Sequence, residues 1–307
     1  MTNKPELICD NKCLVGEGPW WDTDTKRLYW VDSFADKLFV YDSITNVNEE
    51  HYIGKHIGCA IPSKDGRVVL TLQDGLYLYD LNEKSLEELC NVEREIKNNR
   101  LNDAKCDSYG RLWFGSMSMT ANQDDRNFEV TGAFYKFENG FATKEFGDVG
   151  ISNGIAWSEQ ETVMYYIDTT TESVSAFDFE VESGCISNRR IVVRIDPEDG
   201  IPDGMTVDME GMIWVAHFGG GQVSRWNPKT GKVLDRIHLP VLNVTACCFG
   251  GEGLDELYIT TARFGLNRQQ IEEFPYSGGL FKVCPGIKGT ALHKFNHQYN
   301  ISLRRLL

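Results

Sequence analysis

The sequence has no excess of basic residues and no long apolar run. Its 307 residues include 31 Lys and Arg against 45 Asp and Glu, which gives a formal net charge of −14. Proteins that bind nucleic acids or anionic membranes displace counterions with clustered Lys and Arg, so we expect neither partner. No stretch approaches the roughly 20 apolar residues that a membrane-spanning helix needs.

Paired cysteine motifs and a signal peptide are lacking as well. The nine cysteines form no CxxC pair and show no regular spacing. This pattern excludes zinc-finger and thioredoxin-type sites and favours free, buried thiols in a reducing compartment. The first ten residues are polar and lack the apolar core of a signal peptide, so we expect a cytoplasmic protein. An EF-hand loop is also absent from the sequence.

What the sequence does contain is a sixfold repeat. A short apolar or aromatic run recurs every roughly 40–50 residues. These runs start at Leu28, Val68, Leu112, Met164, Ile213 and Leu257. A second run follows each of them, starting at Leu38, Leu76, Ala133, Val174, Val223 and Leu280. A third run precedes each of them, starting at Val15, Ile57, Arg100, Ile151, Ile201 and Val244. The runs are short, rich in β-branched or aromatic residues and bounded by Gly, Asp or Asn, as strands are.

Six repeats of short strands predict an all-β fold, a six-bladed β-propeller with four-stranded blades and a central metal-binding channel. Three strands per repeat are recognisable, and the repeat length leaves room for a fourth. A two-sheet sandwich is the alternative, but it does not account for a sixfold repeat. We predict one domain over residues 1–307, with 292–307 as a solvated or loosely packed C-terminal extension. Short helical turns are expected at 92–98 and 267–274.

One position on the innermost strands stands out because it is polar. In a propeller the innermost strand of each blade lines the central channel. When these strands are aligned by their distance to the following turn, that position holds Glu17, Gly58, Asn102, Asn153, Asp203 and Thr245. Four of these six residues carry a carboxylate or a carboxamide. Burying such groups near the axis is costly without a partner, so we expect a shared ligand. The alternative is that they satisfy backbone groups and trapped water.

The oxygen atoms of Glu17, Asn153 and Asp203 suit one divalent cation, with Ca²⁺ expected first and Zn²⁺, Mn²⁺ or Mg²⁺ as alternatives. Three protein ligands leave coordination positions open for water or substrate. Arg100 lies two residues before Asn102, so on a strand both side chains share one face and point into the channel. The seven Trp are expected to pack within the blades, and His217 is a weaker candidate for the channel rim.

Several segments resemble, in the same order, those of the regucalcin (senescence marker protein), gluconolactonase and luciferin-regenerating enzyme family. They are Val15-Gly-Glu-Gly-Pro-Trp-Trp-Asp, Asn98-Asn-Arg-Leu-Asn-Asp-Ala-Lys-Cys-Asp, Ile151-Ser-Asn-Gly-Ile-Ala-Trp-Ser, Ile201-Pro-Asp-Gly-Met-Thr-Val-Asp and Cys247-Cys-Phe-Gly-Gly. The similarity runs from about Glu6 to Gly289.

The resemblance implies a propeller that holds one divalent cation and hydrolyses sugar lactones such as gluconolactone. It implies that Glu17, Asn153 and Asp203 bind the metal and that Arg100 and Asn102 bind the substrate. Asp203 is also implied as the catalytic acid or base, and whether it or a metal-bound hydroxide activates water stays open. Vertebrate members carry an acidic substrate-binding pair after the segment that matches Gly115-Ser-Met, whereas this chain has Ser118-Met-Thr there.

Three other functions are compatible with the same residues. One is a calcium-binding regulatory protein without essential catalysis. Another is a related propeller hydrolase that acts on a different cyclic ester or on a phosphotriester, because the fold does not fix the substrate. The third is a scaffold with a vestigial channel. The sequence leaves the oligomeric state open.

Overall fold

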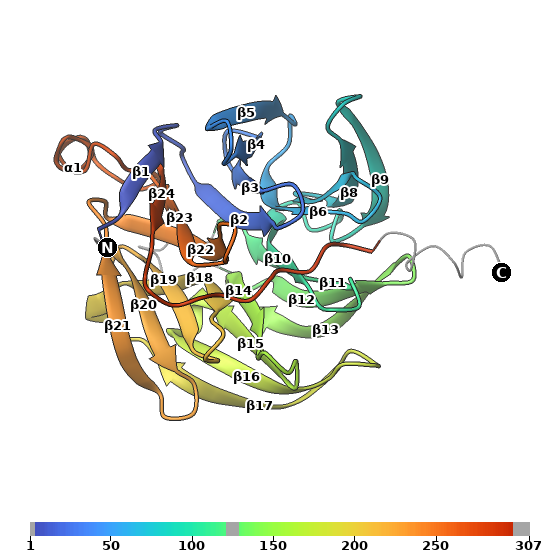
Figure 1. Ribbon diagram of the computed structural model, residues 1–307. Coiled ribbons are helices and arrows are strands. Elements are labelled where there is room, and N and C mark those ends of the chain that lie inside the picture. Colours follow the sequence, from blue (N-terminus) through green and yellow to red (C-terminus); the bar gives the residue numbers. More distant parts are fainter. Residues whose placement is uncertain (1–3, 121–128, 297–307) are drawn as a thin grey trace.

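Six four-stranded antiparallel sheets radiate from a common centre in the computed structural model, which describes residues 4–120 and 129–296 (Figure 1). The predicted six-bladed β-propeller is therefore confirmed. In the first five blades the strands follow one another in chain order from the inside outward. Among the described residues no helix has the length and apolar character needed to cross a bilayer.

The strands of the first three blades have the following bounds. The first blade consists of β2 (Gly16–Asp22), β3 (Arg27–Asp32), β4 (Lys37–Asp42) and β5 (Val47–Tyr52). The second consists of β6 (Ile57–Pro62), β7 (Val68–Leu72), β8 (Gly75–Asp80) and β9 (Ser85–Asn91). The third consists of β10 (Asn99–Cys106), β11 (Leu112–Ser118), β12 (Gly132–Glu138) and β13 (Phe141–Val149).

The other three blades are built in the same way. The fourth consists of β14 (Ser152–Trp157), β15 (Val163–Asp168), β16 (Ser173–Glu180) and β17 (Cys185–Arg194). The fifth consists of β18 (Ile201–Val207), β19 (Ile213–Phe218), β20 (Gln222–Asn227) and β21 (Lys232–His238). The sixth consists of β22 (Asn243–Gly250), β23 (Glu256–Ala262), β24 (Leu280–Val283) and, outermost, β1 (Glu6–Cys9).

The ring is closed by the N-terminal strand. β1 pairs antiparallel with β24, so the sixth blade is made from both ends of the chain, and the blue and red strands lie together in Figure 1. The hydrogen bonds of this pairing hold β1 in the last blade, and the chain then continues into β2 of the first blade. Sheets that close on themselves in this way leave no long edge at the junction.

Helical structure is confined to three short elements among the described residues. The α-helix α1 (Arg268–Glu273) confirms the turn predicted at 267–274, and Asn267 caps it in a capping box with Gln270. Two 3₁₀ turns lie at Thr169–Thr171 and Pro197–Asp199. The helical turn predicted at 92–98 is wrong. Glu93 has a φ of 56°, and its buried carboxylate accepts hydrogen bonds from Ser116, Tyr135 and Asn99, which pull the backbone away from a helix.

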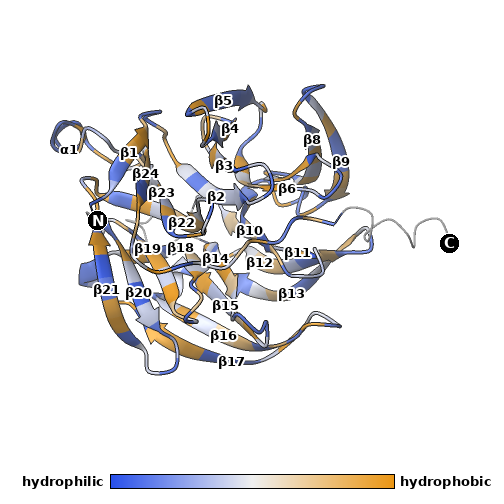
Figure 2. Cartoon of the chain, viewed as in Figure 1, coloured by the Kyte–Doolittle hydropathy of each residue, from blue (hydrophilic) through white to orange (hydrophobic). Residues whose placement is uncertain are grey.

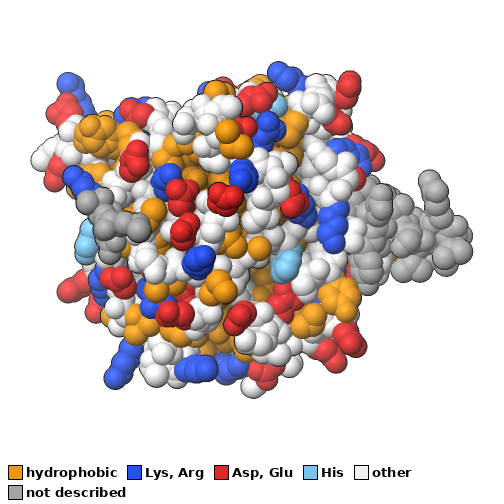
Figure 3. Space-filling view, in the orientation of Figure 1, with side chains coloured by type: hydrophobic (Ala, Val, Ile, Leu, Met, Phe, Trp, Pro, Cys, Tyr) orange, Lys and Arg blue, Asp and Glu red, His pale blue; other side chains and the backbone are white. Residues whose placement is uncertain are grey.

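Apolar packing holds neighbouring blades together. All seven Trp side chains are buried, and Trp21, Trp30, Trp113 and Trp214 are among the largest completely enclosed side chains. All nine cysteines lie within the described residues and none forms a disulfide. On the face shown in Figure 3, acidic and basic side chains are interspersed, and no broad basic surface forms. These observations agree with the expected free thiols and packing tryptophans, but only five of the nine cysteines are buried, and Cys185 is exposed.

The chain after β24 crosses one end of the central channel. Gly289 pairs with Asp208, and Phe295 forms a bridge with Ser63, so this segment touches the ends of inner strands from two blades. Phe295 is completely buried, which shows that residues 292–296 pack firmly instead of forming the expected loose extension. Residues 297–307, with the Arg304-Arg305 pair, lie outside the described residues.

Candidate functional site

A bulge interrupts the inner strand of every blade at the predicted polar position or, in β2, directly after Glu17. In β10, for example, Leu101 faces Ser116 and Ala104 faces Phe114, so the inner strand contains one extra residue. The same one-residue excess occurs in β2, β6, β14, β18 and β22. A bulge re-aims the side chains that it contains. The six repeats thus turn one residue each toward the axis near the start of the inner strands.

The predicted site residues line one pocket. It encloses about 640 Å³ of empty space, counting its open mouth. Its polar lining comprises Glu17, Arg100, Asn102, Asn153, Asp203 and Thr245. The second blade contributes no side chain here because a Cβ on Gly58 would lie 2.3 Å from the carbonyl oxygen of Asn102. Since the segment after β24 touches the opposite ends of the inner strands, the pocket opens at the other end of the channel.

A continuous hydrogen-bond network joins the third and fourth blades at the pocket floor. Nη1 of Arg100 donates to Oδ1 of Asn102 at 2.7 Å, and Nδ2 of Asn102 donates to Oδ1 of Asn153 at 3.2 Å and to the Ser152 carbonyl at 2.8 Å. Nδ2 of Asn153 in turn donates to the hydroxyl of Thr169 at 2.9 Å. This chain of bonds orients both amides and points the Asn153 oxygen toward Asn102. Sequence reasoning did not anticipate Thr169.

Arg100 retains spare hydrogen-bonding capacity. Its guanidinium is 5% exposed, and its Nε has no hydrogen-bond partner among the described residues. Burial lowers the pKa of Arg100 to about 10, while the charges of Glu17 and Asp203 oppose that change. The side chain therefore stays cationic at neutral pH. It presents an unused N–H donor beside the two carboxyl groups.

Glu17 and Asp203 form a buried pair of carboxyl groups. The two residues come from the first and fifth blades, and each carboxyl group acts on the pKa of the other. Burial, and after it the charge of Asp103, raises the pKa of Glu17 to about 8. Burial and the charge of Glu17 raise the pKa of Asp203 well above its usual range. Two such groups favour a positive ion, because its charge offsets both the cost of burying the carboxylates and the repulsion between them.

Asp103 is a third acidic group whose charge acts on this pair, although it does not line the pocket, and the alignment of the repeats did not select it. It follows Asn102 within the same bulge. Burial raises the pKa of Asp103, while the ammonium group of Lys105 opposes this. The floor therefore combines the carboxyl groups of Glu17 and Asp203 with the guanidinium of Arg100, and the charge of Asp103 acts on both carboxyl groups from outside the lining.

The donor set fits a divalent cation. Oδ1 of Asp203 is buried and has no hydrogen-bond partner among the described residues, which is costly for a polar atom unless a ligand binds it. Glu17 uses one carboxylate oxygen to accept from Gly18 and keeps the other available. Within residues 4–120 and 129–296 no cluster of three His, Cys, Asp or Glu could hold a metal. A cation here would take two carboxylates and the amide oxygen of Asn153, all hard ligands.

This pairing predicts that the metal-free protein loses stability as pH rises. Between about pH 4.5 and 8 the folded protein holds a proton on Glu17 that the unfolded chain releases, so the free energy of unfolding falls across this window. Glu17→Gln should flatten the slope by up to about 1.4 kcal/mol per pH unit. This slope is measured by urea unfolding of chelator-treated protein at pH 5, 6.5 and 8. Glu83→Gln, in an exposed turn, is the control, and an unchanged slope in Glu17→Gln contradicts the pairing.

The other residues considered in the sequence analysis, Thr245 and His217, have structural roles. The Thr245 hydroxyl donates to the Gly16 carbonyl at 2.6 Å and so joins the sixth blade to the first. His217 is completely buried beside the Ser224 hydroxyl, and burial lowers its pKa to about 4. His217 does not line the pocket, whereas its neighbour Phe218 does. The described lining also includes no Trp, as expected.

The comparisons with known proteins identify the family of this chain. Residues 15–263 match the SMP-30/Gluconolactonase/LRE-like region. The chain is 38% identical over 278 residues to a Bacillus subtilis (strain 168) protein named "Putative sugar lactone lactonase YvrE", covering 90% of this chain and 93% of that one.

Two solved structures have the same fold. One, described as luciferin-regenerating enzyme, has a TM-score of 0.89 at 33% identity and covers 95% of this chain and 99% of that one. Another, described as a calcium-binding protein, regucalcin, from Agrobacterium tumefaciens, has a TM-score of 0.88 at 25% identity, covering 94% and 96%. The resemblance seen in the sequence is thereby confirmed, and the chain belongs to the SMP-30/gluconolactonase/LRE-like family.

Proposed function

We propose that this protein is a divalent-cation-dependent lactonase that opens small cyclic esters such as sugar lactones. The observation that carries the proposal is the convergence of Glu17, Asn153 and Asp203 with the spare donor of Arg100 in one pocket. Membership of the family and the similarity to a protein named as a sugar lactone lactonase support the reaction class. The nine free thiols support a reducing, cytoplasmic location.

Glu17, Asn153 and Asp203 would hold the cation, and Ca²⁺ is the first choice for this oxygen set. When bound, a divalent cation polarises an ester carbonyl and stabilises the negative charge that develops on its oxygen. Arg100 would hold the substrate through its unpaired Nε–H. Asn102, whose amide is already bonded to Arg100, Ser152 and Asn153, would position Arg100 and Asn153.

Asp203 would act as the base. A carboxylate oxygen of Asp203 that the cation does not occupy would accept a proton from water as the water oxygen forms a bond to the carbonyl carbon. The bond from that carbon to the ring oxygen then breaks, and the ring oxygen takes a proton to become a hydroxyl group. The product is the open hydroxy acid, so one water is consumed for each ester bond broken. Burial keeps bulk water away from these groups and strengthens the interactions.

A lactone panel on metal-stripped protein tests the proposal. We expect no hydrolysis of glucono-1,5-lactone or δ-valerolactone after chelation, and recovery of at least about a hundredfold in kcat/KM on addition of Ca²⁺, Zn²⁺, Mn²⁺ or Mg²⁺. Product acid is followed by proton release, with the spontaneous rate subtracted. Hydrolysis that persists unchanged in the chelated protein, or no hydrolysis with any cation, overturns the proposal.

The buried carboxyl pair also supports a second candidate, a cation-binding protein without essential catalysis. This function needs Glu17, Asn153 and Asp203 but not the spare donor of Arg100. It predicts that Ca²⁺ raises the melting temperature while no lactone is hydrolysed. The same panel, accompanied by a thermal titration with Ca²⁺, separates the two candidates.

A further inference from the structure

The pocket has a sharp division of chemistry between its floor and its wall. The polar lining residues all come from the inner strands. The wall around them is apolar, and it includes Phe34, Met117, Met119, Ile151, Phe218 and Phe264. A reacting ester group can therefore sit on the polar floor while the rest of the molecule lies against hydrocarbon and aromatic rings. Pockets with a few polar groups under an apolar wall fix orientation at the floor and gain affinity from the wall.

Two phenylalanines form an aromatic side to this wall. The rings of Phe34 and Phe264 lie 5.4 Å apart, and the guanidinium carbon of Arg100 lies 5.4 Å from the centre of the Phe34 ring. Phe34 thus links the floor to the rim. Phe264 is 43% exposed, so part of its ring is available to a ligand. An exposed aromatic ring beside a recessed polar site is a ready contact for an apolar substituent.

Phe264 is held in place by its backbone. Its N–H donates to the carbonyl of Leu14 at 2.9 Å, and its carbonyl accepts from Nδ2 of Asn243 at 2.9 Å. These bonds tie the loop after β23 to the segment before β2 and to the start of β22. The wall is therefore formed before a ligand arrives, which lowers the entropy lost on binding.

Polar groups on the floor and beside the wall are already engaged with the protein. The Ser118 hydroxyl is buried and bonds to the Thr120 hydroxyl at 2.7 Å. The Asn102 amide uses its hydrogens on Ser152 and Asn153. Among the described residues the wall offers no carboxylate for the hydroxyl groups of a sugar. Hydroxyls brought against this wall would lose water without gaining partners, which is costly.

We propose that the preferred substrate is a lactone with an apolar substituent, an alkyl chain or an aromatic ring, and not a polyhydroxylated sugar lactone. This inference rests on the proposed lactonase function and names the substrate class of the same site. The ester occupies the floor beside Arg100 and Asp203, and the substituent packs on Phe264 and Phe34. The hydrolytic step is unchanged, with one water consumed and one hydroxy acid formed.

Three six-membered lactones test this assignment on the metal-loaded protein. They are unsubstituted δ-valerolactone, δ-decalactone with its pentyl chain, and glucono-1,5-lactone with its hydroxyls. We expect kcat/KM for δ-decalactone to exceed that for glucono-1,5-lactone by at least about tenfold, a difference of about 1.4 kcal/mol. Phe264→Ala should lower kcat/KM for δ-decalactone by about tenfold and leave δ-valerolactone within about twofold. Ile44→Ala, at an exposed position 70% accessible in the β4–β5 turn, is the matched control.

The outcomes separate the two proposals. A preference for glucono-1,5-lactone, or an equal loss on all three lactones in Phe264→Ala, overturns the apolar-substituent assignment while the lactonase function stands. No hydrolysis of any of the three with any cation overturns the lactonase function and the assignment with it. A circular dichroism melt of Phe264→Ala within about 2 °C of the unchanged protein shows that the loss does not come from unfolding.

Discussion

Asp203→Asn is expected to lower kcat/KM for lactones by about a thousandfold or more. The substitution keeps the size of the side chain but removes its charge and its ability to accept a proton from water. Because Glu17 would then face an amide, the pocket would also lose one of its two anionic ligands for a cation. The Ca²⁺-induced rise in melting temperature should therefore shrink or disappear together with turnover. Initial rates and thermal melts with and without Ca²⁺ measure the two effects.

Asp235→Asn is the control for Asp203→Asn, since Asp235 is exposed on the outer strand β21 and far from the pocket in the sheet order. It should change neither rate nor metal response. Lactone hydrolysis by Asp203→Asn within about tenfold of the unchanged protein would refute the role of Asp203 as the base. Loss of turnover with a full Ca²⁺ response would keep Asp203 as base and remove it from the cation ligands.

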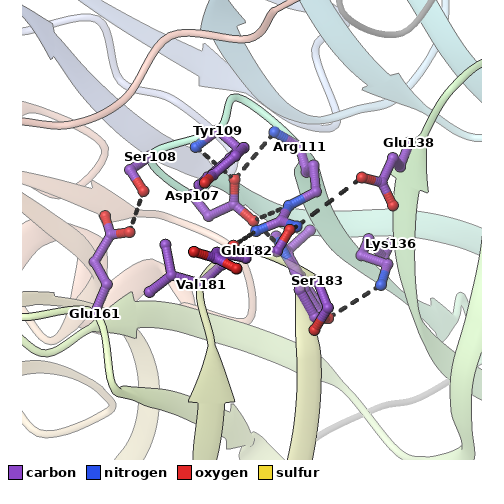
Figure 4. A network of polar contacts seen from close by, with 12 residues as sticks. Asp107, Ser108, Tyr109, Arg111, Lys136, Glu138, Glu161, Val181, Glu182 and Ser183 are labelled. Atoms are coloured by element: carbon purple, nitrogen blue, oxygen red, sulfur yellow. Dashed lines mark hydrogen bonds and ion pairs between the residues drawn. The ribbon is translucent and has the colours of Figure 1, made fainter.

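Asp107→Ala is expected to lower the free energy of unfolding by about 3–5 kcal/mol, because it leaves the buried guanidinium of Arg111 without its anionic partner. The ion pair of Asp107 and Arg111 is completely enclosed, with Nε of Arg111 2.7 Å from the carboxylate (Figure 4). Trp113 also donates to the carboxylate at 2.9 Å. On its far side Arg111 donates to the carbonyls of Val181 and Glu182 in the β16–β17 turn. The pair therefore fastens the third blade to the fourth.

The melting temperature of Asp107→Ala should fall by roughly 5–10 °C, and Asp107→Asn, which keeps an acceptor oxygen, should fall less. The exposed pair of Arg268 and Glu272 supplies the control, because its side chains are 94% and 68% accessible. Glu272→Ala should have the same melting temperature as the protein without substitutions. Equal melting of Asp107→Ala and Glu272→Ala would show that the enclosed pair contributes nothing to the junction between blades.

The blades could be predicted from sequence wherever strands are buried. Inner strands such as β2 and β14 are enclosed along their full length, so their apolar runs are visible in the sequence. Outer strands are solvated on one or both faces and lack that signal. In β5 the residues Asn48, Glu49 and Glu50 are hydrophilic, and most of the strand is blue in Figure 2. The fourth strand of each blade was therefore inferred only from the repeat length, and the role of β1 as the last one was not foreseen.

The polar floor could be predicted because its residues occupy one repeat position. Asn102, Asn153 and Asp203 all lie within the bulge of an inner strand, so distance to the next turn aligns them. Asp103 was not predicted, because the alignment of the repeats selects one residue per inner strand, whereas the bulge in β10 contains both Asn102 and Asp103. Phe34 and Phe264 were not predicted, because they lie in loops whose residues do not follow the repeat pattern. A pattern in the strands can thus reveal chemistry at the floor but says little about the wall, where substrate choice is decided.

Closure of the ring by β1 bears on how this chain is made. Glu6 of β1 pairs with Lys282 of β24, so β1 is synthesised long before its partner strand. At about 5–20 residues per second the interval is roughly 14–55 s. During that time β1 has no partner and the growing stack of sheets ends in an open edge, which other chains can join. Contacts between such distant positions also slow folding itself. The period between translation of the first and last strands is therefore when this protein is most prone to aggregate.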